Sequence, residues 1–445
     1  MTIRLADLQG CFEGVIPSII STAAADGTPN ISYLSHVAMV DDSHIALSNQ
    51  FFAKTAANIR ANPLVTLMLV DGNDGTQYVL DIRFERSIDD GPLFERIALQ
   101  LRATSAQIGM AGIMRLKSAD IFEVLFARRV PSNAELESEA SGRRPANLAA
   151  VGRVSESISN ETEASGIIDT LLDGLHRELG CESAVVLLHD ADCGVLTTVG
   201  SIGHEAAGLG SEVQNKDNLI ASAAAHGRSI KISDLSRARR FGEAILNESR
   251  PDENAGRSIA FPHLSDAMSQ LAVPMIAQGR VRGVIFVESR ERMAFRDDDV
   301  AAVELLARHA ASAIALSERD ADEASTVSAS VPLQLAQSVT IQIIHHAFDD
   351  SIFIGNDYVI KGVAGRLLAF LIDRYLKEGR RDFTNREIRL SESLRLPDLK
   401  DNLETRLLLL RRRLDSKPFP IRLIHTGRGK ITLDMDGMPA IRTVE

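Results

Sequence analysis

The C-terminal segment DNLETRLLLLRRRLD, from Asp401 to Asp415, constrains the fold of this chain more than any other. Four leucines recur at helical spacing and should pack on a core: Leu403, Leu407, Leu410 and Leu414. Polar and basic side chains fall on or near the opposite face: Asn402, Thr405, Arg406, Arg412 and Arg413. A helix of about 14 residues is roughly 21 Å long and fits the major groove of duplex DNA. Arginine supplies paired donors for guanine edges or phosphates.

The elements around this segment follow a definite order. Strands at residues 338–348, 351–355 and 357–362 precede a helix at 364–379. Capping-box patterns at Thr384–Glu387 and Asp401–Glu404 then open a second and a third helix. Strands at 420–427 and 429–435 close the block across a Gly-Arg-Gly tip. We predict DNA contacts from this tip and from the start of the second helix as well: Arg428, Lys430, Asn385 and Arg386.

Charge is distributed unevenly along the chain. The whole sequence has 49 Lys+Arg, 60 Asp+Glu and a formal net charge of −11. Between Ser351 and Asp434, however, 18 basic residues stand against 11 acidic ones, so the basic excess lies in the C-terminal block. An acidic body joined to a basic module is expected of a sensor attached to a domain that binds a polyanion.

The C-terminal block resembles the winged-helix effector domain of response regulators over about residues 339–435. The resemblance is carried by VIKGVAGRLLAFLIDRYL, FTNREI, DNLETRLLLLRRRL and IRLIHTGRGKITL. It implies that the third helix enters the major groove of duplex DNA and that the hairpin, or wing, reaches the backbone or minor groove. No phosphoacceptor domain precedes the block, so its input must come from another kind of domain. The alternative is that the basic face is only a solvated surface.

The first block, to about Arg129, has short alternating strands separated by turns such as DGTP and DGNDG, which indicates an antiparallel barrel or sandwich. We expect strands at residues 14–27, 30–42, 44–50, 65–72 and 77–85. After Asn49 and Gln50, Lys54 and Thr55 open a short helix that ends at Asn62-Pro63. Lysine and threonine at a helix start suit a phosphate.

The pattern HIALSNQFFAKTAANIRANPLVTLMLVD resembles the FMN-binding split barrel of the pyridoxamine-phosphate-oxidase-like superfamily, over about residues 8–130. The resemblance implies a homodimer with FMN at the subunit interface. Lys54 and Thr55 would hold the phosphate, and five residues would line the ring or the ribityl chain: Ser35, His36, Val37, Asn49 and Gln50. Other members of the superfamily bind deazaflavin or haem. The chain has no Trp and no Arg-x-His substrate segment in this block, and a barrel with an empty pocket stays an alternative.

The middle block resembles a GAF domain. The resemblance rests on LAVPM and GVIFVES, which match central strands, and on FRDDDVAAVELLARHAASAIA, which matches the closing helix. We expect a hairpin around residues 278–282 and a small effector enclosed by the segment from Leu209 to Asn254. His189 and Cys193 have a spacing that a metal would tolerate, but a chance placement at a strand end is the simpler interpretation, and we assign no metal site.

Together these observations predict a multidomain α+β protein. We expect a split β-barrel at residues 1–130, a linker at 131–157, a GAF α/β sandwich at 158–318, a linker at 319–332 and a winged helix at 333–445. No apolar run reaches the roughly 20 residues that a membrane span needs, and three cysteines give no disulfide framework, so we expect a cytoplasmic protein without membrane contact.

Three hypotheses for function follow. The first is a DNA-binding transcriptional regulator that senses a flavin redox state or a small ligand. For this hypothesis we expect a homodimer that binds duplex DNA. The second is an FMN-dependent oxidoreductase with appended regulatory domains. The third is a dimeric scaffold, for which a filled barrel pocket and a wing packed on the middle block would be expected. No nucleophile elbow, zinc-protease motif or phosphate loop is present, so we assign no catalytic residue to the chain itself.

Overall fold

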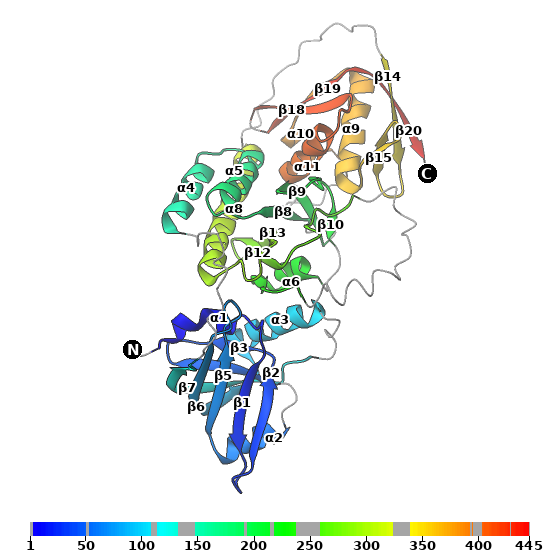
Figure 1. Cartoon of the computed structure of the whole chain (residues 1–445). Helices are drawn as coiled ribbons and strands as arrows, with labels where there is room; N and C mark the ends of the chain where they lie inside the picture. Colours follow the sequence, from blue (N-terminus) through cyan, green and yellow to red (C-terminus); the bar gives the residue numbers. More distant parts are fainter. Residues whose placement is uncertain are drawn as a thin grey trace.

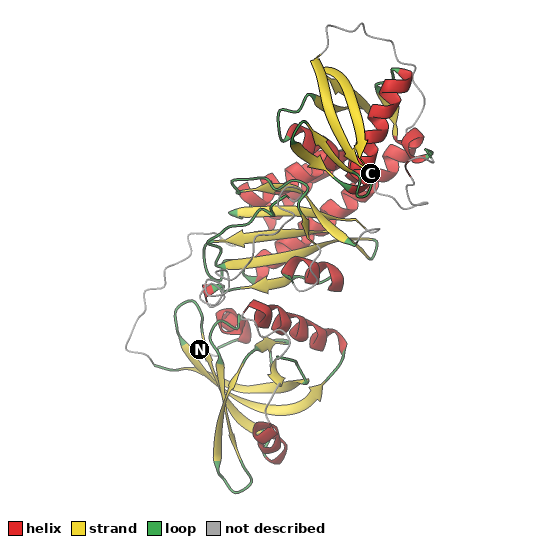
Figure 2. Cartoon of the chain, turned by 90° about the vertical axis from the view of Figure 1, so that its right-hand side faces the viewer, coloured by secondary structure: helices red, strands yellow, loops and turns green. Residues whose placement is uncertain are grey.

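The computed structural model describes residues 3–49, 53–107, 114–131, 147–190, 194–213, 218–236, 259–323, 339–391, 394, 403–427 and 429–444. These residues form three units that follow one another along the long dimension of the molecule in both views (Figures 1 and 2). The central unit lies between the N-terminal and the C-terminal units and contacts both. The chain is therefore a mixed α/β multidomain protein, as expected.

The N-terminal unit is built on an antiparallel sheet of seven strands. Its elements are η1 (Leu5–Leu8), α1 (Gln9–Phe12), β1 (Ser18–Ala23), β2 (Pro29–Leu34), β3 (Val37–Met39), β4 (His44–Asn49), α2 (Ala53–Ala61), β5 (Leu64–Val70), β6 (Gln77–Ile88), α3 (Gly91–Gln107) and β7 (Ser118–Arg129). The core inside the sheet includes Ile20, Leu67, Leu80 and Phe122, all of which are buried.

The strand order of this sheet, β2-β1-β5-β6-β7-β4-β3, places β2 and β3 at opposite edges. Only Ser35 and His36 separate the two strands in sequence, so the edges must come together and the sheet must curl. Register shifts between β6 and β7 assist the bend, because each bulge increases the local twist. The single strand predicted at residues 30–42 is thus two strands, with Ser35 and His36 at the seam.

The central unit is a six-stranded antiparallel sheet in the order β10-β9-β8-β13-β12-β11 with helices on both faces. Its elements are α4 (Leu148–Ser159), α5 (Ala164–Arg177), β8 (Ser183–Asp190), β9 (Val195–Ile202), β10 (Glu212–Val213), α6 (Leu219–His226), β11 (Ile230–Ile232), β12 (Ser269–Ala277), β13 (Arg280–Ser289) and α8 (Asp297–Glu323). The predicted hairpin is confirmed: β12 and β13 join at Gln278 and Gly279, which both have positive φ angles, 53° and 72°. Two left-handed residues form the turn that best matches the twist of the strands.

One face of this sheet is covered by α4, α5 and α8, which share a single apolar core. Ala150, Val151 and Val154 of α4 belong to that core, although residues 131–157 were predicted to be a linker. The prediction is wrong for these residues. The segment LAAVGRVSES forms an amphipathic helix, but its many small side chains resemble the composition of a linker. Within the described residues, α8 is the one helix long and apolar enough to cross a bilayer. Its side chains between Ala302 and Ile314 contribute to the core of this unit.

The described residues of the C-terminal unit include two small sheets and three α-helices. Its elements are β14 (Val339–His346), β15 (Ser351–Ile354), β16 (Asp357–Ile360), α9 (Gly362–Glu378), β17 (Asp382–Thr384), α10 (Asn385–Arg389), α11 (Leu403–Asp415), β18 (Ile421–Gly427), β19 (Lys430–Met435) and β20 (Gly437–Val444). The sheets have the orders β16-β15-β14-β20 and β17-β19-β18, and β20 runs parallel to β14. Strand β20 was not predicted; its Pro439 is tolerated because the strand lies at a sheet edge.

The leucines predicted to face a core do so. Leu403, Leu407, Leu410 and Leu414 of α11 are buried in the core of the C-terminal unit. At the start of α10, Thr384 Oγ1 accepts a hydrogen bond from the Glu387 amide at 3.3 Å, as the capping pattern predicts. The Glu387 carboxylate pairs with Arg380, which ties α10 to the end of α9.

Candidate functional site

The first candidate site surrounds the start of α2, where Thr55 is buried in a polar cluster. Its Oγ1 lies 3.1 Å from Asn30 Nδ2 and 2.9 Å from Ser32 Oγ, both on β2. Asn58, one turn further along α2, donates to Thr22 Oγ1 at 3.1 Å. These bonds fix α2 against the curled sheet, while the neighbouring Lys54 side chain is exposed. A helix start with an exposed ammonium group and a hydroxyl beside it can bind a phosphate.

A narrow cavity of about 10 Å³ adjoins Thr55 and is also lined by Ser48, Asn49 and Asp120. Asn49 Nδ2 donates to Asp120 Oδ2 at 3.2 Å, so the amide is already engaged. Ser87 and Ser118 donate to the other oxygen of the same carboxylate. This cavity holds about one water molecule and does not accommodate an isoalloxazine ring.

Ser35 and His36 line a different and larger cavity, of about 220 Å³. Its other walls come from the segment before β1, from the end of β2 and from α3. Burial lowers the pKa of His36 to about 4, so the imidazole is uncharged at neutral pH. The seam between β2 and β3 therefore lines a different cavity from the one beside Thr55, and Leu34 lies between the two and lines both.

The structure divides the seven residues predicted to bind the cofactor. Asn49 and Thr55 share the narrow cavity, and Ser35 and His36 share the large one. Val37 is buried in the core of the N-terminal unit and lines neither cavity, so its role in cofactor binding stays a prediction. Its side chain points inward, like that of Leu47, its partner on β4. Gln50 lies outside the described residues.

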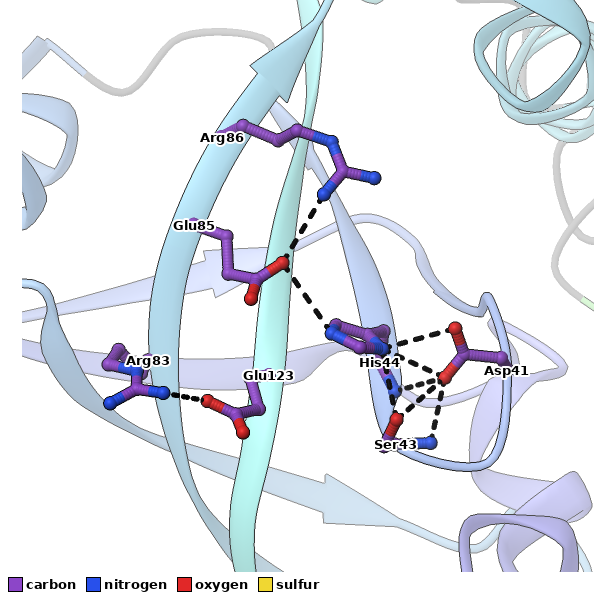
Figure 3. Close-up of polar contacts among 7 residues, drawn as sticks. All are labelled: Asp41, Ser43, His44, Arg83, Glu85, Arg86 and Glu123. Atoms are coloured by element: carbon purple, nitrogen blue, oxygen red, sulfur yellow. Dashed lines mark hydrogen bonds and ion pairs between the residues drawn. The ribbon is translucent and has the colours of Figure 1, made fainter.

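A third polar cluster in the N-terminal unit places a histidine between two carboxylates (Figure 3). Histidine and carboxylate side chains in contact are common in catalytic sites, so we considered this role. His44 Nδ1 lies 2.9 Å from Asp41 Oδ1, and Nε2 lies 3.5 Å from Glu85 Oε2. The Ser43 amide and His44 together lower the pKa of Asp41 to about 2, and Asp41 raises the pKa of His44. Because Asp41 closes its own turn and none of these residues lines a described cavity, we interpret the cluster as structural.

The second candidate site is α11, which was predicted to present a basic face to solvent. From Leu403 to Leu414, every residue of α11 is buried or half-buried. One side packs on its own unit. The other side lies against the central unit, where Leu408 joins the core around α5 and α8. Figure 1 shows α11 at the boundary between the two units.

Arg412 makes the most extensive polar contact across this boundary. Its guanidinium donates to the carbonyl of Val199 at 2.7 Å, to the carbonyl of Ser165 at 2.9 Å and to Asp169 Oδ1 at 2.7 Å. Burial lowers the pKa of Arg412, but the Asp169 carboxylate opposes that shift. Two carbonyls and one carboxylate thus accept from the two terminal nitrogens of the guanidinium.

Further polar pairs join the units. Thr405 Oγ1 donates to Glu318 Oε1 at 3.1 Å, and His425 Nδ1 on the β18–β19 hairpin lies 2.8 Å from Glu163 Oε1. Lys361 Nζ, at the start of α9, lies 2.9 Å from Glu212 Oε2. The helix and the hairpin predicted to contact DNA are thus both held by the central unit.

The remaining residues predicted to contact DNA have varied surroundings. Arg413 donates to the carbonyls of Tyr358 and Val359 in its own unit, at 3.1 and 2.8 Å. Arg406 is buried, and buried Asn385 donates to Glu404. These three were predicted to contact DNA, but in this structure Asn385 and Arg406 are buried, and the Asn385 amide and the Arg413 guanidinium are engaged within the C-terminal unit. Arg386 is exposed and Lys430 is half-buried, whereas Asn402 and Arg428 lie outside the described residues.

A histidine and a glutamate with buried side chains lie together on the sheet face of the central unit opposite α5. His204 Nε2 lies 3.6 Å from Glu288 Oε2, and both side chains are almost fully buried. Neither ring nitrogen of His204 has a hydrogen-bond partner. Glu288 accepts from the Leu264 amide at 2.8 Å and from Gln270 at 2.9 Å. The segment expected to enclose an effector lies mostly outside the described residues, as does Cys193, and no cluster of metal-ligand side chains occurs among the described ones.

Helix α3 is the functional element that the sequence reading missed. Leu99 of α3 is buried in the second core of the central unit, on the sheet face that carries α6. Gln100 Nε2 donates to the Lys231 carbonyl on β11. Lys231 Nζ in turn lies 2.7 Å from Glu13 Oε1 of the N-terminal unit, and Ser233 donates to the same carboxylate. The N-terminal unit thus covers part of the central sheet.

Comparisons with known families assign two of the three units. The family model described as pyridoxamine 5'-phosphate oxidase matches residues 7–128, and the family model of the GAF domain matches residues 161–315. The N-terminal unit is therefore a pyridoxamine-phosphate-oxidase-like domain, and the central unit is a GAF domain. No curated protein matches the chain. The two domains support a ligand-sensing or flavin-related role.

Solved structures resemble single units of the chain. An FMN-binding protein from Syntrophomonas wolfei shares 19% identity, with 28% of this chain and 88% of that chain covered, at a TM-score of 0.25. The GAF domain of an Acinetobacter phosphoenolpyruvate-protein phosphotransferase shares 15% identity, covering 41% and 97%, at 0.32. A free methionine-R-sulfoxide reductase from Neisseria meningitidis shares 16% identity, covering 38% and 89%, at 0.30.

Proposed function

We propose that this protein is a DNA-binding transcriptional regulator whose C-terminal unit is a winged helix with α11 as the recognition helix. In this proposal the GAF domain holds α11 closed, and a signal from the two ligand-type domains releases it. The observation that carries the proposal is the double use of α11: four leucines anchor it in its own unit, and its basic side meets the GAF domain.

The kind of contact favours a reversible interface. Asp169 and Glu163 keep 67% and 44% of their side-chain area exposed, so water can replace their partners when the units separate. Contacts between domains of one chain resemble transient interfaces, and relative motion is the default expectation when they are polar. Opening would offer the guanidiniums of Arg411 and Arg412 and the imidazole of His425 to a polyanion. Two copies of the chain, paired through their barrels, would supply the two-fold symmetry that paired half-sites need.

The flavin part of the proposal rests on the donors at α2. Exposed Lys54, buried Thr55 and the start of α2 fit a phosphate, but the adjoining cavity of about 10 Å³ does not fit the ring within one chain. A flavin held there would need the cover of a second subunit, as the resemblance implies. When bound, FMN supplies redox chemistry; Lys54 and Thr55 would hold its phosphate, and we derive no reaction step through it.

Two other functions stay open as candidates. The match to pyridoxamine 5'-phosphate oxidase favours an FMN-dependent oxidoreductase, which predicts a yellow protein that turns over a reductant. The packing of the hairpin on the GAF domain favours an assembly scaffold. The scaffold hypothesis also expects a filled barrel pocket, and the cavity of about 220 Å³ speaks against that part of it. An absorbance spectrum of the purified protein separates a flavin, a haem and a colourless chain.

The test of DNA binding uses the full chain and a labelled random-sequence duplex, with fluorescence anisotropy read at several salt concentrations. We expect the variant Asp169→Arg, which opposes Arg412 with a like charge, to bind at low salt and to lose affinity steeply as salt rises. Replacing exposed Arg386 with Ala in that variant should weaken binding, whereas Arg374→Ala, on the far end of α9, should not. Absence of binding in both the wild type and Asp169→Arg at low salt would refute the proposal.

A further inference from the structure

The large cavity of the N-terminal unit lies where three parts of the chain meet. Glu13, Gly14 and Pro17 form one wall, the end of β2 with Ser35 and His36 forms another, and α3 closes the third side. Its volume, about 220 Å³, is below the roughly 300–1,000 Å³ of pockets that hold drug-sized ligands. A compound that enters must be small.

The charged side chains around this cavity are already paired with other groups of the protein. Glu13 Oε1 lies 2.7 Å from Lys231 Nζ, and its other oxygen accepts from Ser233. Among the described residues that line the cavity, none is a lysine or an arginine. His36 is held neutral by burial. The two cations near His36 are engaged, Lys231 with Glu13 and Arg96 with the Met39 carbonyl, so a charged ligand would have to compete for these groups and the fitting ligand is uncharged.

The lining suits a flat molecule with a polar edge. Pro17, Leu34, Leu101 and Met114 give apolar surface, and a methionine thioether contacts ring edges favourably. Tyr33, at the cavity, keeps 70% of its area exposed and can lie against a ring. The neutral imidazole of His36 can donate or accept one hydrogen bond.

Helix α3 separates this cavity from the GAF domain. Leu101, Thr104 and Ser105 of α3 line the cavity, while Leu99 is buried in the GAF core. Gln100 donates to the carbonyl of Lys231 on β11, the same residue whose ammonium group holds Glu13. A ligand that shifts α3 or Glu13 therefore acts on β11 directly.

We propose that this cavity binds a small uncharged ring compound, at a site separate from the pocket beside Asn49 and Thr55, and that α3 and Glu13 convey its occupancy to β11 of the GAF domain. This ligand would be the small-molecule signal of the regulator proposed above, and its role as a signal rests on the proposed function. Binding itself requires no DNA.

The binding test uses indole, an uncharged ring compound with one hydrogen-bond donor. Saturation-transfer NMR measures its binding to the full chain. The chain has no tryptophan, so a variant with one carries a single reporter. Thr104→Trp places an indole side chain at the cavity and should weaken indole binding at least about tenfold, which corresponds to about 1.4 kcal/mol. Arg102→Trp, an exposed position of α3 that does not line the cavity, is the matched control and should bind as the wild type does.

Three results would overturn the site. Indole could fail to bind the wild type, could bind Thr104→Trp as well as the control, or could be displaced by FMN, which would place the cavity within the flavin site. The relay is tested by hydrogen exchange at Ile230–Ile232 of β11. We expect indole to slow this exchange in the wild type but not in Gln100→Ala, which should still bind indole. Unchanged exchange in the saturated wild type would refute the relay, whatever the outcome of the DNA experiments.

Discussion

Replacing Asp169 with Arg tests whether the GAF domain holds α11 closed. Asp169 Oδ1 lies 2.7 Å from Arg412 Nη2, and Asp169 is 67% exposed. Because Asp169 is largely exposed and Arg412 keeps its two carbonyl acceptors, losing the pair costs about 1 kcal/mol. A like charge about 4 Å away adds about 1 kcal/mol of repulsion under water-like screening. The closed state should lose about 1–2 kcal/mol, which shifts the opening equilibrium roughly 5- to 30-fold.

The apparent affinity for DNA should rise by a similar factor. A protein whose competent state is only partly populated binds more weakly by that fraction, so any gain in the open population appears directly in the measured affinity. Fluorescence anisotropy with a random-sequence duplex at low salt measures it. The gain should shrink at high salt, where both the repulsion and DNA binding are screened.

A matched control separates release of α11 from added positive charge. Asp173→Arg makes the same change on the same helix, but Asp173 pairs with Arg177 of α5, at 3.4 Å, and not with α11. We expect the control to bind DNA as the wild type does, apart from a small electrostatic gain. Equal affinities for the two variants would refute the argument that the Arg412 contact closes the protein.

Three further predictions concern the other units. Leu171→Ala, at the fully buried centre of α5, should cost about 2–5 kcal/mol and lower the melting temperature of the GAF domain in calorimetry, and an unchanged melt would contradict the assigned core. Asp41→Asn should lower the pKa of His44 in an NMR titration. In the wild type the pKa of Asp41 is lowered to about 2 and that of His44 is raised. The pair should therefore stabilise the folded chain most between about pH 4 and 6.5. That stability should fade as rising pH deprotonates His44 and as falling pH protonates Asp41, whereas a pH-independent difference would speak against it. Thr55→Val should reduce FMN uptake measured by absorbance, while Thr66→Val, which only loses its bond to Asp81, should not; equal uptake would remove Thr55 from the phosphate site.

Local patterns predicted the elements whose partners are close in sequence. The turn at Gln278 and Gly279 follows from neighbouring residues, and the leucine face of α11 follows from four leucines within about three helical turns; both are confirmed. The break at Ser35 and His36 could not be found in this way. The alternation of side chains continues through both residues, and only the meeting of the two sheet edges makes the strand end there.

Helix α3 escaped prediction because it is apolar on two sides. Ile97 and Leu101 face the N-terminal unit, whereas Leu99 faces the GAF domain. Two apolar faces blur the period of 3.6 residues on which a helix prediction rests. The same limit applies to Arg412: spacing shows that the residue is off the leucine face of α11, but it does not show what covers it.

Arg412 allows closing and DNA binding to be separated, because the proposal gives it both tasks. In the wild type, Arg412→Ala removes the bonds to Val199, Ser165 and Asp169. Under the proposal this change opens α11 and also removes a DNA contact. The two effects on apparent affinity have opposite signs. In the Asp169→Arg background α11 is open more often, so the same substitution should show the lost contact with less compensation. A double-mutant cycle measured by anisotropy should therefore be non-additive, with the larger loss in the Asp169→Arg background. Equal losses in both backgrounds would mean that Arg412 does not close the protein.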